Sequence, residues 1–297
     1  MRALRIHGYG GPEVLRLEEA PRPVAGPGQV LVKVRAASVN PIDWKMRRGL
    51  MAKVFPIKFP RVLGRDCAGE LEGGLVAGVS DPRTNGTHAE YALLPADQAA
   101  PIPEGLSPEE ATSLCVTGIS AYIALVENAR VSGGHRVLVH AGAGGVGSLA
   151  IQIARQLGCE VFATASPPNH DYCRSLGAVA VVDYRSQDFT AAVPPCDVVL
   201  DTIGGDTHQR SLKILKPGGT VVALAAEPIP QGPRRPDVRD TMVNVRPTRE
   251  RLLQLFQWAT SGIIKPQVTQ RFKPEQAGKA YAISESGHAR GKMVIQF

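Results

Sequence analysis

The chain has 297 residues, 43% of them hydrophobic, so it is long enough for two globular domains, and collagenous, coiled-coil and disordered proteins are excluded. Its five cysteines are odd in number and widely spaced, which favours reduced thiols. Its net charge of +7 comes from scattered basic residues that form no nucleic-acid-binding module. No apolar run approaches the ~20 residues of a membrane helix and no signal-peptide pattern follows Met1, so we expect a cytoplasmic protein without nucleic-acid or membrane partners.

The first hundred residues contain short β-branched runs broken by Gly and Pro. Examples are Gln29-Val-Leu-Val-Lys-Val-Arg35 and Glu90-Tyr-Ala-Leu-Leu94. This pattern predicts a small, twisted β domain. At Ser107-Pro-Glu-Glu110 the pattern changes to a helix capping box with Pro at the first helical position, which predicts the start of an apolar helix.

The middle of the chain alternates between buried strands and amphipathic helices. Arg136-Val-Leu-Val-His140 is followed by a glycine loop and a helix over residues 148–157, and further strands are expected at 161–165, 178–182, 198–200 and 220–224. This alternation predicts an α/β fold with a doubly wound parallel sheet. The Pro-rich residues 228–236 predict an exposed loop, either a connector or a flap over a site.

The glycine loop reads Ala141-Gly-Ala-Gly-Gly-Val-Gly147 and contains a G-x-G-x-x-G motif. It follows a buried strand and precedes an amphipathic helix, which is the context in which this motif binds a dinucleotide. The first glycine permits a tight turn, the second lets the backbone approach a pyrophosphate, and the third lets helix and strand pack closely. We therefore expect the cofactor to contact Gly142, Gly144, Gly145, Val146 and Gly147.

The end of the second strand indicates which dinucleotide is bound. NAD-binding proteins usually carry Asp or Glu there, but this chain has no carboxylate before Asp171. A 2′-phosphate would meet no repulsion, and Ser166, His170 and Arg174 offer hydrogen-bond donors or positive charge. NADPH is therefore the expected cofactor, although Arg174 also fits a solvent-facing helix residue.

Six ordered stretches together resemble the zinc-independent quinone oxidoreductases of the medium-chain dehydrogenase/reductase family. They are Ala37-Ser-Val-Asn-Pro-Ile-Asp43, Phe59-Pro-Arg-Val-Leu-Gly-Arg-Asp-Cys-Ala-Gly69, Gly86-Thr-His-Ala-Glu-Tyr91, the glycine loop, Leu215-Lys-Pro-Gly-Gly219 and Ser286-Gly-His-Ala-Arg-Gly-Lys292. The resemblance implies a GroES-like catalytic domain at 1–113 and 242–297, a Rossmann NADPH-binding domain at 114–241, an active site in the cleft between them, and a homodimer.

The same resemblance also indicates whether the chain binds a metal ion. Where the zinc alcohol dehydrogenases carry a Cys, this chain has the Asn40 to Asp43 segment, and where they carry Gly-His-Glu it has Gly64-Arg65-Asp66. Their four-cysteine structural lobe is missing as well. Because zinc needs three or four Cys, His or acidic ligands, we expect no metal.

The resemblance also implies roles for single residues. Asn40 is expected near the nicotinamide and substrate, with Asp43 and Thr117 as further catalytic candidates, while Ser166 and Tyr184 are expected near the 2′-phosphate. Gly204 and Lys292 complete the expected cofactor contacts. The residues themselves leave alternatives open: Asn40 and Asp43 suit a turn, and Thr117, matched to a helix start, suits a helix-terminal hydroxyl.

A hydride donor in a site without metal needs an electron-poor acceptor that hydrogen bonds alone can polarise. We therefore expect an enzyme that uses NADPH to reduce a quinone or the C=C bond of an α,β-unsaturated carbonyl, with Asn40 orienting the oxygen and water supplying the proton. Residues 70–86 are shorter than the family pattern. We interpret residues 71–81 as a shortened bridge that either widens the cleft or changes which substrates the β domain admits. Two alternatives stay open: a secondary-metabolism enoyl reductase for a bulky substrate, and a non-catalytic NADPH-binding sensor or partner protein.

Overall fold

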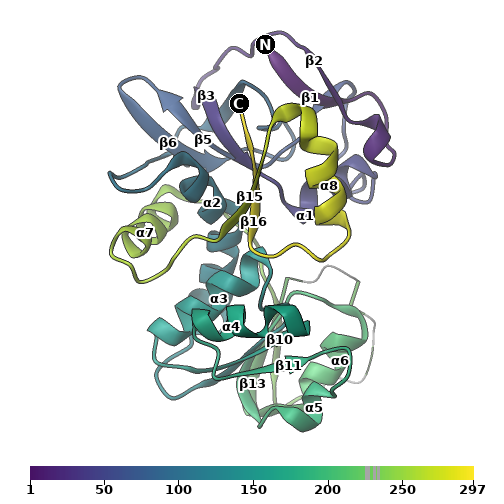
Figure 1. Ribbon diagram of the computed structural model, residues 1–297, viewed down its shortest axis with the longest axis vertical. Helices are drawn as coiled ribbons and strands as arrows, with labels where there is room; N and C mark the ends of the chain where they lie inside the picture. Colours follow the sequence, from purple (N-terminus) through teal and green to yellow (C-terminus); the bar gives the residue numbers. More distant parts are fainter. Residues whose placement is uncertain (225–227, 230–231, 233–234) are drawn as a thin grey trace. The chain divides into compact units, whose positions relative to one another are not determined.

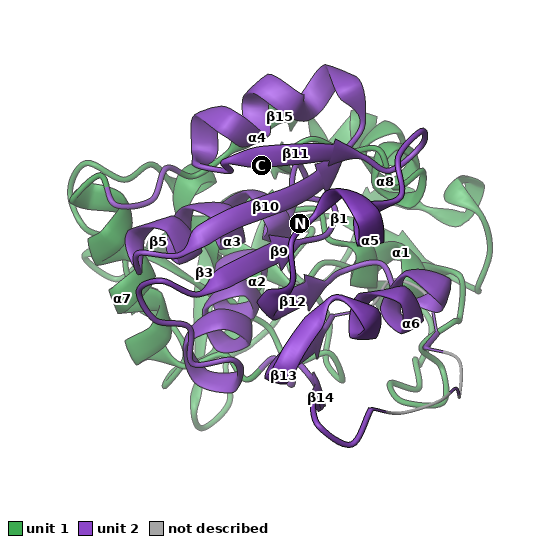
Figure 2. Ribbon diagram, turned by 90° about the horizontal axis from the view of Figure 1, so that it is seen from below, with its two compact units in different colours: residues 1–116, 246–262, 266–297 green, residues 117–245, 263–265 purple. Residues whose placement is uncertain are grey.

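The computed structural model describes residues 1–224, 228–229, 232 and 235–297. These residues divide into two compact units (Figure 2), which are unit 1, residues 1–116, 246–262 and 266–297, and unit 2, residues 117–245 and 263–265. The domain boundaries expected from the sequence stay a prediction. The Pro-rich residues 228–236 lie partly outside the described residues, so the choice between connector and flap also stays open.

Unit 1 is built on antiparallel strands from both ends of the chain (Figure 1). β3 (Gln29–Ser38) pairs with β5 (Asp66–Leu71), with β7 (Tyr91–Pro95) and with β16 (Lys292–Gln296). In β3 the alternate residues Val32, Val34 and Ala36 are buried, as the period of a half-buried strand requires. The C-terminal strand therefore completes a sheet begun within the first forty residues.

The remaining elements of unit 1 close its core. The larger sheet also contains β15 (Val268–Phe272), β6 (Gly74–Val79) and β8 (Ala100–Pro101), and a smaller sheet has the order β2 (Arg16–Glu19), β1 (Arg2–Ile6), β4 (Arg61–Val62). The helices are α1 (Pro41–Arg47), α7 (Arg249–Thr260) and α8 (Ala277–Glu285), with 3₁₀ turns at Pro12–Val14 and Pro274–Gln276. Leu4, Ile6, Met46, Leu63 and Tyr281 form part of one buried cluster.

α2 (Pro108–Tyr122) starts where the capping box predicted. The Ser107 N–H donates to the Glu110 carboxylate at 3.0 Å, and the Glu110 N–H donates to the Ser107 hydroxyl at 3.3 Å. Thr117 therefore lies inside this helix, so the expected helix start at Thr117 is wrong. The physical reason is that the helix begins nine residues earlier and no residue before Thr117 interrupts it.

The interpretation of residues 71–81 as a shortened bridge needs a correction. β5 and β6 form an antiparallel hairpin in which Leu71 pairs with Gly74, and Gly73 has a left-handed φ of 81°. The glycine permits this tight turn, so the short segment still supplies a paired strand. A surface hollow of about 850 Å³ in unit 1 is lined by Arg22, Leu31, Leu71, Leu75, Tyr91 and their neighbours. It contains none of the expected site residues.

Unit 2 has the predicted parallel, doubly wound sheet. Its order is β11 (Ala180–Asp183), β10 (Glu160–Ala165), β9 (Arg136–Val139), β12 (Cys196–Asp201), β13 (Leu215–Ala223) and β14 (Arg239–Met242). The helices of this unit are the π-helical segment Ile123–Asn128, α3 (Gly145–Gln156), the 3₁₀ turn Pro167–Asn169, α4 (His170–Leu176), α5 (Phe189–Ala192) and α6 (Gly205–Lys213). The predicted strands are confirmed, and β14 is an addition.

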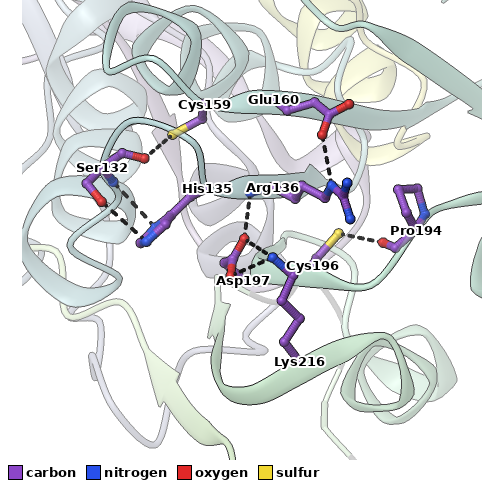
Figure 3. A network of polar contacts seen from close by, with 9 residues as sticks. All are labelled: Ser132, His135, Arg136, Cys159, Glu160, Pro194, Cys196, Asp197 and Lys216. Carbon is purple, nitrogen blue, oxygen red and sulfur yellow. Dashed lines mark hydrogen bonds and ion pairs between the residues drawn. The ribbon is translucent and has the colours of Figure 1, made fainter.

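Hydrogen bonds and ion pairs of charged residues connect the first residues of β9, β10, β12 and β13 in unit 2 (Figure 3). Asp197 accepts the Arg136 N–H at 2.8 Å and both its oxygens accept from Lys216 Nζ, at 2.9 and 2.8 Å. Arg136 also donates to Glu160 at 2.9 Å. These contacts lie at the amino ends of the strands, opposite the carboxyl ends.

None of the helices in the described part of the chain has the length and hydropathy of a membrane span.

Candidate active-site residues

The strand order of unit 2 reverses between β9 and β12, because the chain moves outward to β10 and β11 on one side and to β13 and β14 on the other. In open parallel sheets, ligands bind at the carboxyl ends of the strands that flank such a reversal. The glycine loop follows β9 there, and Thr202 follows β12. The Thr202 hydroxyl donates to the His140 carbonyl at 3.0 Å, which joins the two segments.

Each glycine of the loop meets a different steric demand. A Cβ on Gly142 would lie 2.8 Å from the Ala163 Cβ, and a Cβ on Gly147 would lie 2.3 Å from the Ala141 carbonyl oxygen. Gly142 thus allows the loop to pass over β10, and Gly147 allows α3 to pack against the loop. Ala141 itself has a φ of 49°, which a non-glycine residue rarely adopts.

The loop fits a dinucleotide phosphate. Gly144 is the N-cap of α3, and Gly144, Gly145 and Val146 are partly exposed, whereas Gly147 is buried. The first turn of an α-helix has N–H groups without intrahelical acceptors, and these groups bind anions together with the helix dipole. The residues expected at the pyrophosphate therefore lie in one loop, and the residues that reach its surface carry no side chain larger than valine.

The loop after β12 is also held in a fixed conformation. Gly204 and Gly205 have φ values of 85° and 55°, and one Asp201 oxygen accepts from the Ile203 and Gly204 N–H groups at 2.9 and 3.0 Å. The other Asp201 oxygen lies 2.9 Å from Nδ1 of the buried His208. The hydrogen bond with Asp201 raises the pKa of His208, and Nε2 of the same ring lies 3.2 Å from the Asp240 carboxylate.

The residues expected at the 2′-phosphate follow β10 and β11. Ser166 directly follows β10, and its hydroxyl accepts from Asn169 Nδ2 at 3.1 Å. His170 Nε2 lies 3.2 Å from the Ala165 carbonyl, so Nε2 carries a hydrogen and Nδ1 remains for a ligand. Asp183 ends β11, and the electrostatic influence of His170 is among the causes that lower the pKa of this carboxyl, after its hydrogen bonds with Ser186 and Arg185.

Two of the expected phosphate contacts are on the surface of unit 2. Arg174 pairs with Asp171 one helical turn away at 2.9 Å, and both side chains are at least half exposed. This arrangement agrees with the solvent-facing alternative for Arg174. Tyr184 is exposed, and the Arg185 guanidinium lies 5.6 Å from its ring centroid. Arg185 is a cation at this edge that the sequence motifs did not indicate.

In unit 1 the structure brings together Asn40, Asp43 and Lys292. Asn40 caps α1, and its N–H donates to the Asp43 carboxylate at 2.7 Å. Lys292 Nζ donates to Asn40 Oδ1 at 2.8 Å and to the Val39 carbonyl at 2.9 Å. All three site residues are at most 4% exposed. Asn40 and Asp43 are therefore cap residues of a helix, and their side chains also belong to a buried polar cluster.

Asp66 is the centre of this cluster. Its Oδ1 accepts from the Ser38 N–H at 3.2 Å and the Ser38 hydroxyl at 2.6 Å, and its Oδ2 accepts from the Val116 N–H at 3.2 Å. Both oxygens lie 3.3 Å from Asn40 Nδ2. Asp66 thus joins β3, β5 and α2 to the Asn40 side chain.

A second set of contacts, from His88 and Tyr281, holds the Ser38 backbone in place. His88 Nε2 lies 3.1 Å from the Ser38 carbonyl, which can only accept, so Nε2 carries the hydrogen. Nδ1 of the neutral ring then accepts from the Tyr281 hydroxyl at 2.8 Å. Burial lowers the pKa of His88 to about 4, so the ring stays neutral at physiological pH.

Burial also changes the ionisation of the cluster itself. It raises the pKa of the Asp43 carboxyl to about 7, against the hydrogen bond from Asn40 and with a further rise from the charge of Asp66. The other Asp43 oxygen, Oδ1, is buried without a hydrogen-bond partner. Burial lowers the pKa of Lys292, while the carboxylates of Asp66 and Asp43 oppose that effect.

Sequence reasoning missed Asp66, Ser38, His88 and Tyr281 as members of this cluster. One signal for Asp66 was available, because it is the only charged residue in the otherwise small and apolar run Asp66-Cys-Ala-Gly69. A carboxylate in a strand core needs several donors, which implies a polar cluster around it. The partners themselves come from distant segments and carry no local signal.

The donor set of unit 1 does not suit zinc. Arg65 occupies a position where a ligand would be needed, and its guanidinium donates to the Ser80 carbonyl. The Asn40 oxygen is bonded to an ammonium, and the Asp66 oxygens are bonded to N–H and O–H donors. Among the residues that the structure describes, no group of three or more His, Cys, Asp or Glu side chains is arranged to hold a metal ion.

Two family models match the chain. The alcohol dehydrogenase GroES-like domain matches residues 26–104, and the zinc-binding dehydrogenase model matches residues 176–295. The 2-methylene-furan-3-one reductase of Solanum lycopersicum is 34% identical, over 99% of this chain and 79% of its own length.

Solved structures give the same result. The quinone oxidoreductase of Coxiella burnetii superposes with a TM-score of 0.93 at 33% identity, over 100% of this chain and 99% of that one. The Escherichia coli quinone oxidoreductase complexed with NADPH gives 0.91 at 27% identity, over the whole of both chains. The chain therefore belongs to the medium-chain dehydrogenase/reductase family, as a quinone oxidoreductase-like enzyme of a family that uses a nicotinamide cofactor.

Proposed function

We propose that the chain catalyses the NADPH-dependent reduction of a quinone, or of a C=C bond conjugated to a carbonyl, without a metal. The observation that carries this proposal is the buried Asn40 amide held between an ammonium and a carboxylate, where zinc-using relatives carry metal ligands. The names of the relatives support both acceptor classes, since one is a quinone oxidoreductase and one reduces a methylene-furanone.

The residues of unit 2 would hold the cofactor. The N–H groups of Gly144 to Val146 would bind the pyrophosphate at the start of α3, and Ser166 and His170 would bind the 2′-phosphate. When bound, the reduced nicotinamide supplies a hydride. The Ser166 hydroxyl lies just after β10, and Arg185 adds a guanidinium just after the neighbouring strand β11, so this chain favours NADPH over NADH.

The residues of unit 1 would act on the acceptor. Hydride addition at carbon places negative charge on the carbonyl oxygen, which a fixed N–H donor stabilises. Asn40 Nδ2 is such a donor, because its geometry is set before any substrate arrives. Water supplies the proton in this proposal. Neither step needs a Lewis acid, because quinones and enones are already electron-poor.

The test measures oxidation of NADPH and, separately, of NADH against quinones and enones of graded size. Turnover with NADPH preferred, undiminished after treatment with a chelator, is the expected result. Binding of NADPH without reduction of any acceptor would instead favour the sensor alternative. Turnover of bulky acceptors alone would favour the secondary-metabolism enoyl reductase.

Assembly and location complete the proposal. The family resemblance implies a homodimer, and light scattering of the purified protein measures its mass. A cytoplasmic location stays a prediction, which imaging of the tagged protein in its own cell tests.

A further inference from the structure

The Asn40 side chain lies between a group that can only donate and a group that can only accept. Lys292 Nζ is 2.8 Å from Oδ1, and both Asp66 oxygens are 3.3 Å from Nδ2. An ammonium has no acceptor and an ionised carboxylate has no donor. Rotating the amide by half a turn would place NH₂ against the ammonium and the oxygen against the carboxylate. The amide therefore has one allowed orientation.

The backbone and the partners of this amide are fixed as well. The Asn40 N–H is bonded to Asp43, and Lys292 is bonded a second time, to the Val39 carbonyl. Asp66 is held by the Ser38 N–H and hydroxyl. These contacts join β3, α1, β5 and β16 within unit 1. A side chain fixed from several rigid elements keeps its geometry without cost at the moment of reaction.

The hydrogen-bond lengths show which end of the amide is held by the longer contacts. The bond to Oδ1 is short at 2.8 Å, so the oxygen is fully engaged. The contacts of Nδ2 with Ser38 Oγ, the Ser38 carbonyl and both Asp66 oxygens are 3.2 to 3.4 Å, at or beyond the long end of an ordinary N–H···O bond. The ammonium on Oδ1 also polarises the amide and strengthens its N–H groups as donors. The N–H end is therefore the end of the amide for which an acceptor's oxygen would compete.

We propose that Lys292 and Asp66 are positioning residues that act through Asn40, locking its amide so that only N–H is presented to the oxygen of the acceptor. The proposal rests on the proposed function and deepens it. It restricts the substrate class to acceptors whose reacting oxygen lacks a hydrogen and gains negative charge on reduction. An alcohol that must donate its proton to the site is excluded from that position.

A double-mutant cycle tests this assignment with the best quinone or enone as substrate. Asn40→Ala removes the donor and is expected to lower kcat about 100-fold, as the loss of one oxyanion-hole donor does. Lys292→Met frees the amide to rotate and is expected to lower kcat at least about 10-fold with a smaller change in KM. If Lys292 acts through Asn40, the double variant is no slower than Asn40→Ala alone. Losses that multiply would overturn the proposal.

Two matched variants separate positioning from general destabilisation. Lys292→Gln can still donate to Oδ1, so it is expected to retain more activity than Lys292→Met. Lys279→Met makes the same change at an exposed site on α8 and is expected to leave kcat unchanged. A loss in Lys279→Met equal to that in Lys292→Met would contradict the assignment.

A measurement independent of turnover observes the amide itself. The chain has five asparagines, so ¹⁵N-asparagine labelling gives five side-chain NH₂ signals, and Asn40→Ala identifies the one from Asn40. That signal is expected to exchange slowly with solvent in the unmodified chain, and to shift and exchange faster in Lys292→Met, or in Lys292→Gln should Lys292→Met not fold. An unchanged signal would overturn the proposal. Absence of turnover with every acceptor would refute the proposed function, and this measurement would still decide the orientation.

Discussion

Asp43→Asn should change how the stability of unit 1 depends on pH. Burial raises the pKa of this carboxyl from 3.8 to about 7, a rise of about 3 units. A folded-state pKa above the unfolded one means that the folded state binds the proton more tightly. The stability from this group is fully present below the unfolded pKa and is lost as pH rises through about 7. At 1.36 kcal/mol per unit, the full effect is about 4 kcal/mol.

Asparagine removes the titration and keeps an oxygen that can accept the Asn40 N–H. Between about pH 5 and pH 8, the unmodified chain should therefore lose about 3 kcal/mol of unfolding free energy relative to Asp43→Asn. Urea unfolding followed by tryptophan fluorescence suits this measurement, because both tryptophans, Trp44 and Trp258, belong to unit 1. Asp97→Asn, at an exposed position of the same unit, is the control. Parallel pH profiles for Asp43→Asn and the unmodified chain would refute the argument.

Three further outcomes are expected in unit 2. Gly147→Ala places a methyl 2.3 Å from the Ala141 oxygen and should weaken NADPH binding at least about tenfold in a fluorescence titration, and unchanged affinity would contradict the loop geometry. Ser166→Asp sets a carboxylate against the 2′-phosphate, so the KM for NADPH should rise about tenfold while that for NADH barely changes. His208 has a raised pKa because of Asp201, so its stabilisation is present below about pH 6.5 and lost above the folded pKa. The difference in unfolding free energy between the unmodified chain and His208→Gln should therefore decrease as the pH rises, which unfolding followed by circular dichroism measures.

Features of unit 2 could be predicted from sequence because their causes are local. The glycine loop, the strand before it and the helix after it lie within about twenty consecutive residues. Gly147 is required by a contact with Ala141 inside that stretch, whereas Gly142 is required by Ala163 on the next strand. The capping box of α2 spans four residues and is formed as predicted. An interaction between residues that are close in sequence can be predicted from the local residue pattern.

The cluster in unit 1 could be predicted only in part because its contacts are distant in sequence. Asn40 and Lys292 are 252 positions apart, and Ser38 and His88 are 50 apart. No local pattern encodes that β16 pairs with β3, so the ammonium on Asn40 could not be expected from the motif that contains either residue. The error at Thr117 has the opposite origin: a match to a family helix start outweighed a local capping signal ten residues earlier.

The cluster costs free energy to fold, and this cost is an argument for its function. Asp66 and Lys292 are nearly fully buried polar groups, and burying charges is often no more stabilising than burying apolar side chains of similar volume. Stability alone would therefore favour replacing both. Asp66 and Lys292 nonetheless hold one amide in one orientation, which apolar residues cannot do. The proposed reaction polarises a carbonyl without a Lewis acid and needs that fixed donor, which would explain why the chain keeps buried charges that the fold alone does not require.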